Sequence, residues 1–200
     1  MLKPVRIAVL VSGGGTNLQA LLDAQTRGEL QSGQITLVVS DHADAYALTR
    51  AENHGVKAVV ISERGEAFET KLLEVLKAEG IELVILAGFL QILGIHFIKA
   101  YEDRIINVHP SLIPSFCGKG FYGLKVHKAA LEKGVKVTGA TVHMVNEIPD
   151  GGRILFQKAV EILDGDTPEI LQKRVMEQAE WILLPRAAEA VSRQIREEGN

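Results

Sequence analysis

Apolar residues in the first half of the chain come in short continuous runs that alternate with segments of helical periodicity. The runs have the length of strands and little polar alternation, which indicates burial on both faces; they cover residues 5–11, 34–40, 57–61, 82–88 and 105–108. The segments between them predict four helices. They lie at residues 16–28, at residues 44–55 with Asp44 at the start, after the third run with an end at about residue 79, and at residues 92–101. This alternation is typical of a parallel sheet with helices on both faces.

The pattern changes after Pro114. A glycine-rich, aromatic loop, SFCGKGFYGL, leads to a predicted helix at residues 125–133. Two longer strands, at residues 137–145 and 152–162, are expected to form an antiparallel extension, and residues 167–198 a long helix with Pro168 near its first turn. We therefore expect a three-layer, Rossmann-like α/β fold with a mostly parallel sheet, an antiparallel C-terminal extension and a long C-terminal helix. No linker or internal repeat interrupts residues 1–200, which predicts a single domain.

Ligands of open α/β sheets bind at the carboxyl ends of the strands. The residues that follow four of the predicted strands are therefore candidates for a site, at positions 12–17, 41–44, 88–90 and 107–110. The first group, SGGGTN, joins a strand to a helix, so the amides of Gly15, Thr16 and Asn17 would favour an anion such as phosphate. It is neither a Walker A loop nor a good dinucleotide fingerprint, and a tight turn alone would favour the same glycines.

Asn107 and His109 stand two residues apart where an apolar run ends, and Pro110 and Pro114 stiffen the loop behind them. On an extended strand the two side chains point to the same side. An Asn can donate to a developing oxyanion and a His can carry a proton near neutral pH, which would suit acyl transfer through a tetrahedral intermediate. A capping Asn and a structural His would give the same pattern.

Asp150, in the turn sequence PDGG, is the candidate carboxylate that would orient His109, although Asp is also common in a plain hairpin turn. His143, in the strand before it, is expected to make a supporting contact. The histidines at positions 42, 54 and 96 show no metal-ligand clustering, and Cys117 has no partner at zinc-site spacing, so no metal is expected.

Charge and composition narrow the classes of partner. The 200 residues carry a formal net charge of -3, without the basic stripe that nucleic-acid binding needs. No apolar run reaches the ~18 residues of a membrane span, and the N-terminal apolar run leads directly into the glycine turn, so we interpret it as a strand rather than a signal peptide. The single cysteine indicates a reducing compartment. We expect a cytoplasmic protein that binds neither nucleic acid nor membrane.

Several segments together resemble the glycinamide ribonucleotide formyltransferase family, folate-dependent enzymes of purine synthesis. They are IAVLVSGGGTNLQAL, LAGFLQIL, INVHPSLIPSF, TGATVHMVNEIPDGG and RVMEQAEWILLP, and they extend over residues 7–185. The resemblance implies the formyltransferase version of the fold and transfer of a formyl group from 10-formyltetrahydrofolate to the amine of 5-phosphoribosylglycinamide. It further implies that folate is a co-substrate, that no cofactor is tightly bound, and that the protein is a monomer or homodimer.

The resemblance also implies the residues of the site. The catalytic residues would be Asn107, His109 and Asp150. The residues that bind the phosphate and ribose of the nucleotide would be Gly13, Gly14, Gly15, Thr16, Asn17 and Glu180. The residues that bind the folate would be Phe89, Leu90, Gln91, Ile92, Leu93, Asn107, Asn146, Glu147, Ile148, Pro149 and Asp150. Gln91 stands where the family often has Arg or Lys.

On this interpretation the amine attacks the formyl carbon, and Asn107 and protonated His109 donate hydrogen bonds to the resulting oxyanion. Asp150 favours the charged imidazole or orders a water that shuttles the proton. The alternatives are another folate-dependent formyltransferase or a formyltetrahydrofolate hydrolase, which usually carry a further C-terminal or N-terminal domain that we do not expect here. A non-catalytic nucleotide-binding module would keep the glycine loop but would have no use for the three polar residues together.

Overall fold

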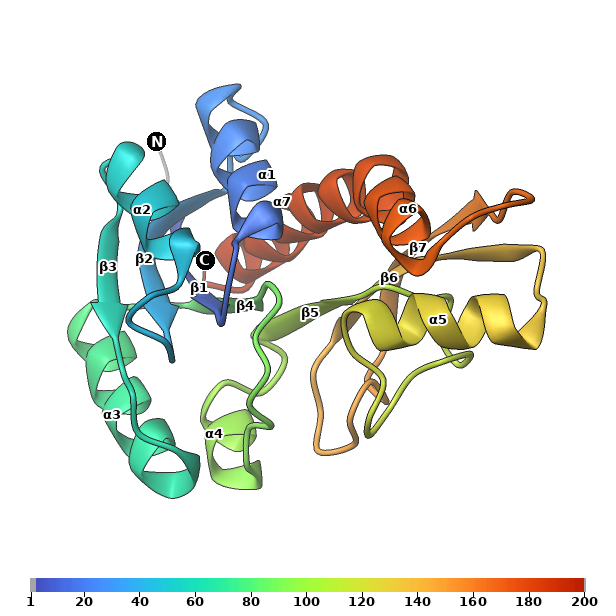
Figure 1. Cartoon of the computed structure of the whole chain (residues 1–200). Helices are drawn as coiled ribbons and strands as arrows, with labels where there is room; N and C mark the ends of the chain where they lie inside the picture. The colour runs from blue at the N-terminus through green and yellow to red at the C-terminus, as the bar shows by residue number, and fades with distance from the viewer. Residues whose placement is uncertain (1–2, 200) are drawn as a thin grey trace.

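The computed structural model describes residues 3–199 and shows one twisted sheet flanked by helices (Figure 1). Its strands are β1 (Val5–Val11), β2 (Gly33–Ser40), β3 (Lys57–Val60), β4 (Leu83–Leu86), β5 (Ile105–His109), β6 (Val137–Met144) and β7 (Ile154–Glu161). Its helices are α1 (Thr16–Thr26), α2 (Tyr46–Asn53), α3 (Gly65–Ala78), α4 (Ile95–Ala100), α5 (Leu124–Lys133), α6 (Pro168–Val175) and α7 (Trp181–Glu198).

The sheet has seven strands in the order β3-β2-β1-β4-β5-β6-β7. The first five strands in this order are parallel to one another, whereas β6 runs antiparallel to both β5 and β7. The chain first winds outward from β1 to β3 and then returns to the other side of β1 with β4. This reversal of direction places the carboxyl ends of β1 and β4 at a switch point, where open α/β sheets bind their ligands.

Two apolar cores cover the two faces of the sheet, which makes three layers. One core joins α1, α2, α6 and α7 to the sheet, and the other joins α3 and α4 to the opposite face. The central strands are buried on both sides; β1 and β4, for example, are almost fully inaccessible. The continuous apolar runs of the sequence follow from this burial, because a strand between two helical layers has no solvent face. The predicted α/β fold is confirmed.

Two details of the sequence prediction are wrong. Helix α2 begins at Tyr46 after Ala45 and not at Asp44, because residues 42–45 form a turn in which the Ala45 amide donates to the His42 carbonyl. The predicted helix over residues 167–198 is divided by a π-helical turn, η1 (Met176–Glu180), between α6 and α7. In this turn the Trp181 amide donates to the carbonyl of Met176, five residues back. None of the helices within residues 3–199 is long and apolar enough to cross a membrane.

Candidate active site

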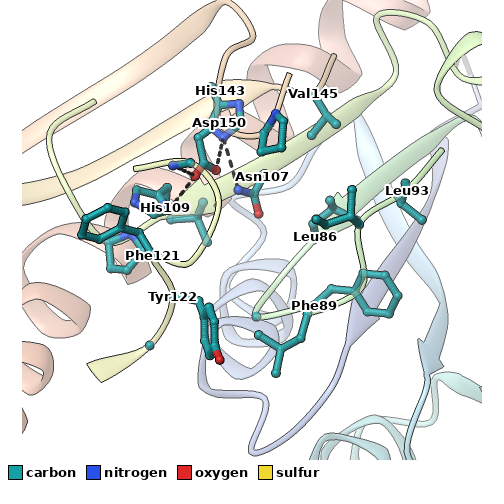
Figure 2. A pocket seen from close by; sticks show the side chains of 18 of the residues that line it. Leu86, Phe89, Leu93, Asn107, His109, Phe121, Tyr122, His143, Val145 and Asp150 are labelled. Atoms are coloured by element: carbon teal, nitrogen blue, oxygen red, sulfur yellow. Dashed lines mark hydrogen bonds and ion pairs between the residues drawn. The ribbon is translucent and has the colours of Figure 1, made fainter. Parts of the chain in front are cut away.

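A cavity of about 570 Å³ opens at the carboxyl edge of the sheet. Its wall includes the ends of β4 and β5, the loops that follow them, the start of α1, the β6–β7 loop and the end of the α6–η1 segment. The polar side chains of Asn107, His109, His143 and Asp150 gather at one side, and Leu86, Phe89 and Leu93 lie at the other (Figure 2). The cavity therefore has a polar wall facing an apolar wall.

Strand β5 supplies the first two polar side chains. Asn107 and His109 lie on the same face of the strand, and the apolar Val108 between them belongs to the core beneath. Across the antiparallel pair, Asn107 lies opposite His143 and His109 lies opposite Thr141. The strand thus places an amide and an imidazole side by side on a rigid element.

His143 fixes the orientation of Asn107. The Nδ1 atom of His143 lies 2.7 Å from the Met144 carbonyl oxygen, so it carries the proton and donates. Its Nε2 atom is then an acceptor, and it lies 3.2 Å from Nδ2 of Asn107. One N–H of the Asn107 amide is held in this way, and the amide has a second N–H to donate to another acceptor. His143 therefore contacts Asn107, and its supporting role in the site stays a prediction.

His109 is buried between a carbonyl group and a carboxylate. Its Nε2–H donates to the Phe116 carbonyl at 2.9 Å, and its Nδ1 lies 3.4 Å from Oδ2 of Asp150. Burial lowers the pKa of His109 below its ordinary value, although the Asp150 charge and the Phe116 carbonyl act in the opposite direction. At neutral pH the imidazole is thus mainly neutral, with a proton-accepting nitrogen that faces an anion.

Asp150 lies in the β6–β7 loop with a φ of 56°, a conformation that Asp tolerates better than most residues. Its Oδ2 accepts from the Gly118 amide at 2.8 Å, and its Oδ1 lies 3.5 Å from His143 Nε2. Burial alone would raise the pKa of Asp150, but the contacts with His143, His109 and the Gly118 amide outweigh it and hold the pKa below its ordinary value. The carboxylate is therefore charged and faces two imidazoles.

Glu180 lies in the same cavity on the π-helical turn. Its side chain is buried, and the Asn17 amide nitrogen donates to it at 2.7 Å. Burial raises the pKa of Glu180 to about 7, against the smaller effect of the Asn17 hydrogen bond. The neighbouring Thr16 hydroxyl contacts the Met176 sulfur at 3.6 Å, so the start of α1 and the turn are joined at two points.

The predicted phosphate loop is only partly in the cavity wall. Thr16 and Asn17 line it, whereas Gly13, Gly14 and Gly15 do not. The carbonyls of Gly13 and Gly14 accept from the Ala47 amide and the Arg50 guanidinium. These glycines therefore pack the loop against α2.

The residues predicted for folate all line the same cavity. One group, residues 89–93, follows β4, and the other, residues 146–150, forms most of the β6–β7 loop. Phe89 stacks on Phe68 of α3 with ring centroids 5.5 Å apart, which anchors the start of the first group. The first loop is mostly apolar, whereas the second carries Asn146, Glu147 and Asp150 beside Ile148 and Pro149.

The structure also adds residues that the sequence did not indicate. The segment at residues 118–123 lines the cavity, as do Gln172 and Met176 from the α6–η1 side. His127 of α5 is fully buried, and burial lowers its pKa to about 4, so it stays neutral. Glycine and aromatic content was the only sequence signal for residues 118–123. Among residues 3–199, no group of three or more His, Cys, Asp or Glu side chains could hold a metal ion.

Comparisons with known proteins show the family of the chain. Residues 5–187 match the family described as formyl transferase. The chain therefore belongs to the formyl transferase family.

Relatives within the family indicate one branch. A solved structure of glycinamide ribonucleotide transformylase 1 from Symbiobacterium toebii is 42% identical, covers 96% of this chain and 89% of its own, and superposes with a TM-score of 0.88. Phosphoribosylglycinamide formyltransferase, chloroplastic, from Arabidopsis thaliana is 40% identical over 86% of this chain. The trifunctional purine biosynthetic protein adenosine-3 of Gallus gallus is 43% identical over 94% of this chain. These relatives confirm the resemblance to the glycinamide ribonucleotide branch.

The chain is shorter than the curated relatives that it matches. It spans 60% of the length of the Arabidopsis protein and 18% of the length of the Gallus protein.

Proposed function

We propose that the chain transfers a formyl group from 10-formyltetrahydrofolate to the primary amine of 5-phosphoribosylglycinamide. The observation that carries this proposal is the group formed by Asn107, His109 and Asp150, which shares one cavity with an apolar wall and the buried Glu180. An amide donor, an imidazole and a carboxylate are the groups that acyl transfer through an oxyanion requires. The family and the named relatives support the same reaction.

The reaction begins when the amine nitrogen attacks the formyl carbon and a negative charge develops on the formyl oxygen. The second N–H of Asn107 donates to this oxygen. The amine loses a proton to Nδ1 of His109, and the resulting imidazolium stabilises the oxyanion by its charge. The intermediate then collapses, the bond between the formyl carbon and the folate nitrogen breaks, and His109 returns the proton to that nitrogen. A donor of this kind contributes ~3–4 kcal/mol to the transition state.

The environment of His109 suits a proton that is held only during the reaction. Burial lowers its pKa in the free protein, so the imidazole does not keep a proton beforehand. When His109 takes up a proton at Nδ1 during the reaction, the Asp150 carboxylate, 3.4 Å away, stabilises the charged imidazole. Asp150, whose own pKa lies below the ordinary value, remains the anion of that pair.

Different parts of the cavity suit the two substrates. Glu180 can accept hydrogen bonds from the ribose hydroxyls, and the amides at the start of α1 favour the phosphate. The loops at residues 89–93 and 146–150 offer apolar surface and backbone groups for the pterin of the folate. Folate acts as co-substrate, so the reaction needs no tightly bound cofactor.

We further propose that residues 1–200 form one formyltransferase domain, which the family match over residues 5–187 and the single sheet support. The cytoplasmic location and the monomeric or homodimeric state stay predictions.

A formyl-transfer assay tests the proposal. The protein is mixed with 10-formyltetrahydrofolate and glycinamide ribonucleotide, and loss of the formyl folate is followed by absorbance. We expect turnover that requires the amine substrate. Deformylation at the same rate without the amine would identify a hydrolase, and no deformylation by folded protein would contradict the proposed reaction.

A further inference from the structure

The segment at residues 88–94 between β4 and α4 has no regular structure, although it forms much of the apolar wall of the cavity. Two of its apolar side chains are exposed, with Leu90 at 59% and Ile92 at 70% of full accessibility. A segment that neither pairs with a strand nor buries these side chains depends on other contacts to keep one shape. Its supports therefore decide whether the wall is preformed.

Asp41, the first residue after β2, is one of these supports. Its side chain is completely inaccessible to solvent. Its Oδ2 accepts from the Gln91 amide nitrogen at 3.1 Å and from the Arg64 guanidinium at 3.0 Å, and its Oδ1 lies 2.8 Å from Nδ1 of His42. Asp41 thus joins the end of β2 to the middle of the 88–94 segment.

Ser12 extends this network to a second point of the segment. Its hydroxyl makes a hydrogen bond to the Asp41 carboxylate and accepts from the Leu90 amide at 3.0 Å. On the far side, the Gly94 amide donates to Glu69 of α3 at 2.6 Å. The Asp41 network therefore holds Leu90 and Gln91, and Glu69 holds the far end.

Because the Asp41 carboxylate is buried and charged, removing it should disrupt the hydrogen-bond network. A buried carboxylate is stable only when its oxygens are satisfied, and here the satisfying groups come from three separate segments of the chain. Removing it leaves the half-buried Ser12 hydroxyl and Gln91 amide without their acceptor. Asp41 itself does not line the cavity, so any effect on a ligand must pass through the segment.

We propose that Asp41 is a positioning residue, which holds the 88–94 segment in the shape that binds the formyl folate. The larger effect should fall on the folate, because the nucleotide groups Asn17 and Glu180 are held by each other and not by the Asp41 network. Loss of Asp41 should therefore weaken the binding of folate and leave the binding of the nucleotide and the chemical step nearly unchanged.

The test compares Asp41→Ala with wild type in steady-state kinetics and in calorimetric titration with tetrahydrofolate. We expect the KM for 10-formyltetrahydrofolate and the Kd for tetrahydrofolate to rise about tenfold, which is the effect of losing ~1.4 kcal/mol of preorganisation. The KM for glycinamide ribonucleotide and kcat should change less than about twofold. Gln91→Leu, which removes one partner and keeps the carboxylate, should raise the folate KM by a smaller factor.

Glu189→Gln is the matched control. Glu189 is a carboxylate of α7 that accepts from the amides of Gln31 and Ser32 at the opposite end of β2, so it supports a loop away from the cavity. We expect this variant to lower the melting temperature while the folate KM and the tetrahydrofolate Kd stay at the wild-type values.

Three results would overturn the inference. Unchanged folate binding in Asp41→Ala is the first, and equal losses for both substrates is the second. The third is a rise in the folate KM in Glu189→Gln as large as that in Asp41→Ala. The inference rests on the proposed function, and the two fail differently: wild-type protein that neither binds tetrahydrofolate nor transfers the formyl group would overturn both, whereas wild-type activity with an unaffected Asp41→Ala overturns the positioning role alone.

Discussion

Single residues in the cavity owe their properties to neighbours on other elements. The Asn107 amide is oriented by His143, whose own tautomer is set by a backbone carbonyl. His109 would be an ordinary buried histidine without Asp150, which comes from a loop more than 40 positions away in the chain. The same side chains with other neighbours would be structural, which is why their roles stayed ambiguous when the residues were considered alone.

Glu180 yields a prediction about pH. Its pKa is about 7 in the folded protein, above the ordinary 4.5 that applies when the chain is unfolded. Between these values the folded state holds the extra proton, so this group makes stability fall as the pH rises from 4.5 to 7. The shift corresponds to about 3 kcal/mol in total.

Replacement by an amide isolates this contribution. We expect the free energy of unfolding of Glu180→Gln, relative to wild type, to increase by about 2–3 kcal/mol between pH 5 and pH 8. Urea denaturation at the two pH values measures it, and all other groups titrate in both proteins. A difference that does not change with pH would show that Glu180 is ionised normally.

At the scale of elements, the antiparallel pairing of β5 with β6 creates the polar wall. Because β6 runs opposite to β5, His143 comes to lie directly across from Asn107, and the loop after β6 returns Asp150 over His109. The π-helical turn has a similar effect elsewhere in the cavity, since it places Glu180 against Asn17. Turns of this kind are frequent at functional sites.

Most elements could be predicted from the sequence, because apolar runs and helical periodicity report burial directly. The π-helical turn could not, since one extra residue in a turn alters hydrogen bonding without removing the apolar pattern. Pro185, inside α7, lacks the amide that would donate to the preceding turn, but a proline marks a break in the hydrogen bonding and does not specify a π-helical turn. The Asp44 prediction failed because a local turn competed with helix capping.

The glycine loop gives a prediction at this scale. Gly15 has a φ of 71°, and an added Cβ would lie 2.6 Å from the Cβ of Ala47 in α2. Gly28, after α1, has a φ of 74° and open space around the same atom. Both Ala substitutions lower the free energy of unfolding by ~1–2 kcal/mol, because Ala is strained in the left-handed conformation. Gly15→Ala lowers it by a further ~1–3 kcal/mol through overpacking against α2.

We therefore expect Gly15→Ala to lose clearly more stability than Gly28→Ala in urea denaturation. An equal loss in the two variants would show that α2 moves aside freely and that the close packing of the loop is not required.

At the scale of the whole molecule, the sheet brings together segments that span residues 12–180. The sequence indicated four strand ends as candidates for a site, and the structure shows that residues from three of them line the cavity. The fourth, at residues 41–44, has no place in the wall, but Asp41 supports it through Gln91. The sequence placed this residue at the right edge of the sheet, yet its partners depend on a loop conformation that no local pattern encodes.

The central claim is that this assembly stabilises an oxyanion during formyl transfer, and the kcat of Asn107→Ala tests it most directly. Asn53→Ala, at an exposed position on α2, is the matched control. We expect kcat to fall on the order of 10²-fold or more in Asn107→Ala, the loss of one oxyanion donor, with the wild-type melting temperature and with Asn53→Ala fully active. Near-native turnover by Asn107→Ala would contradict the account.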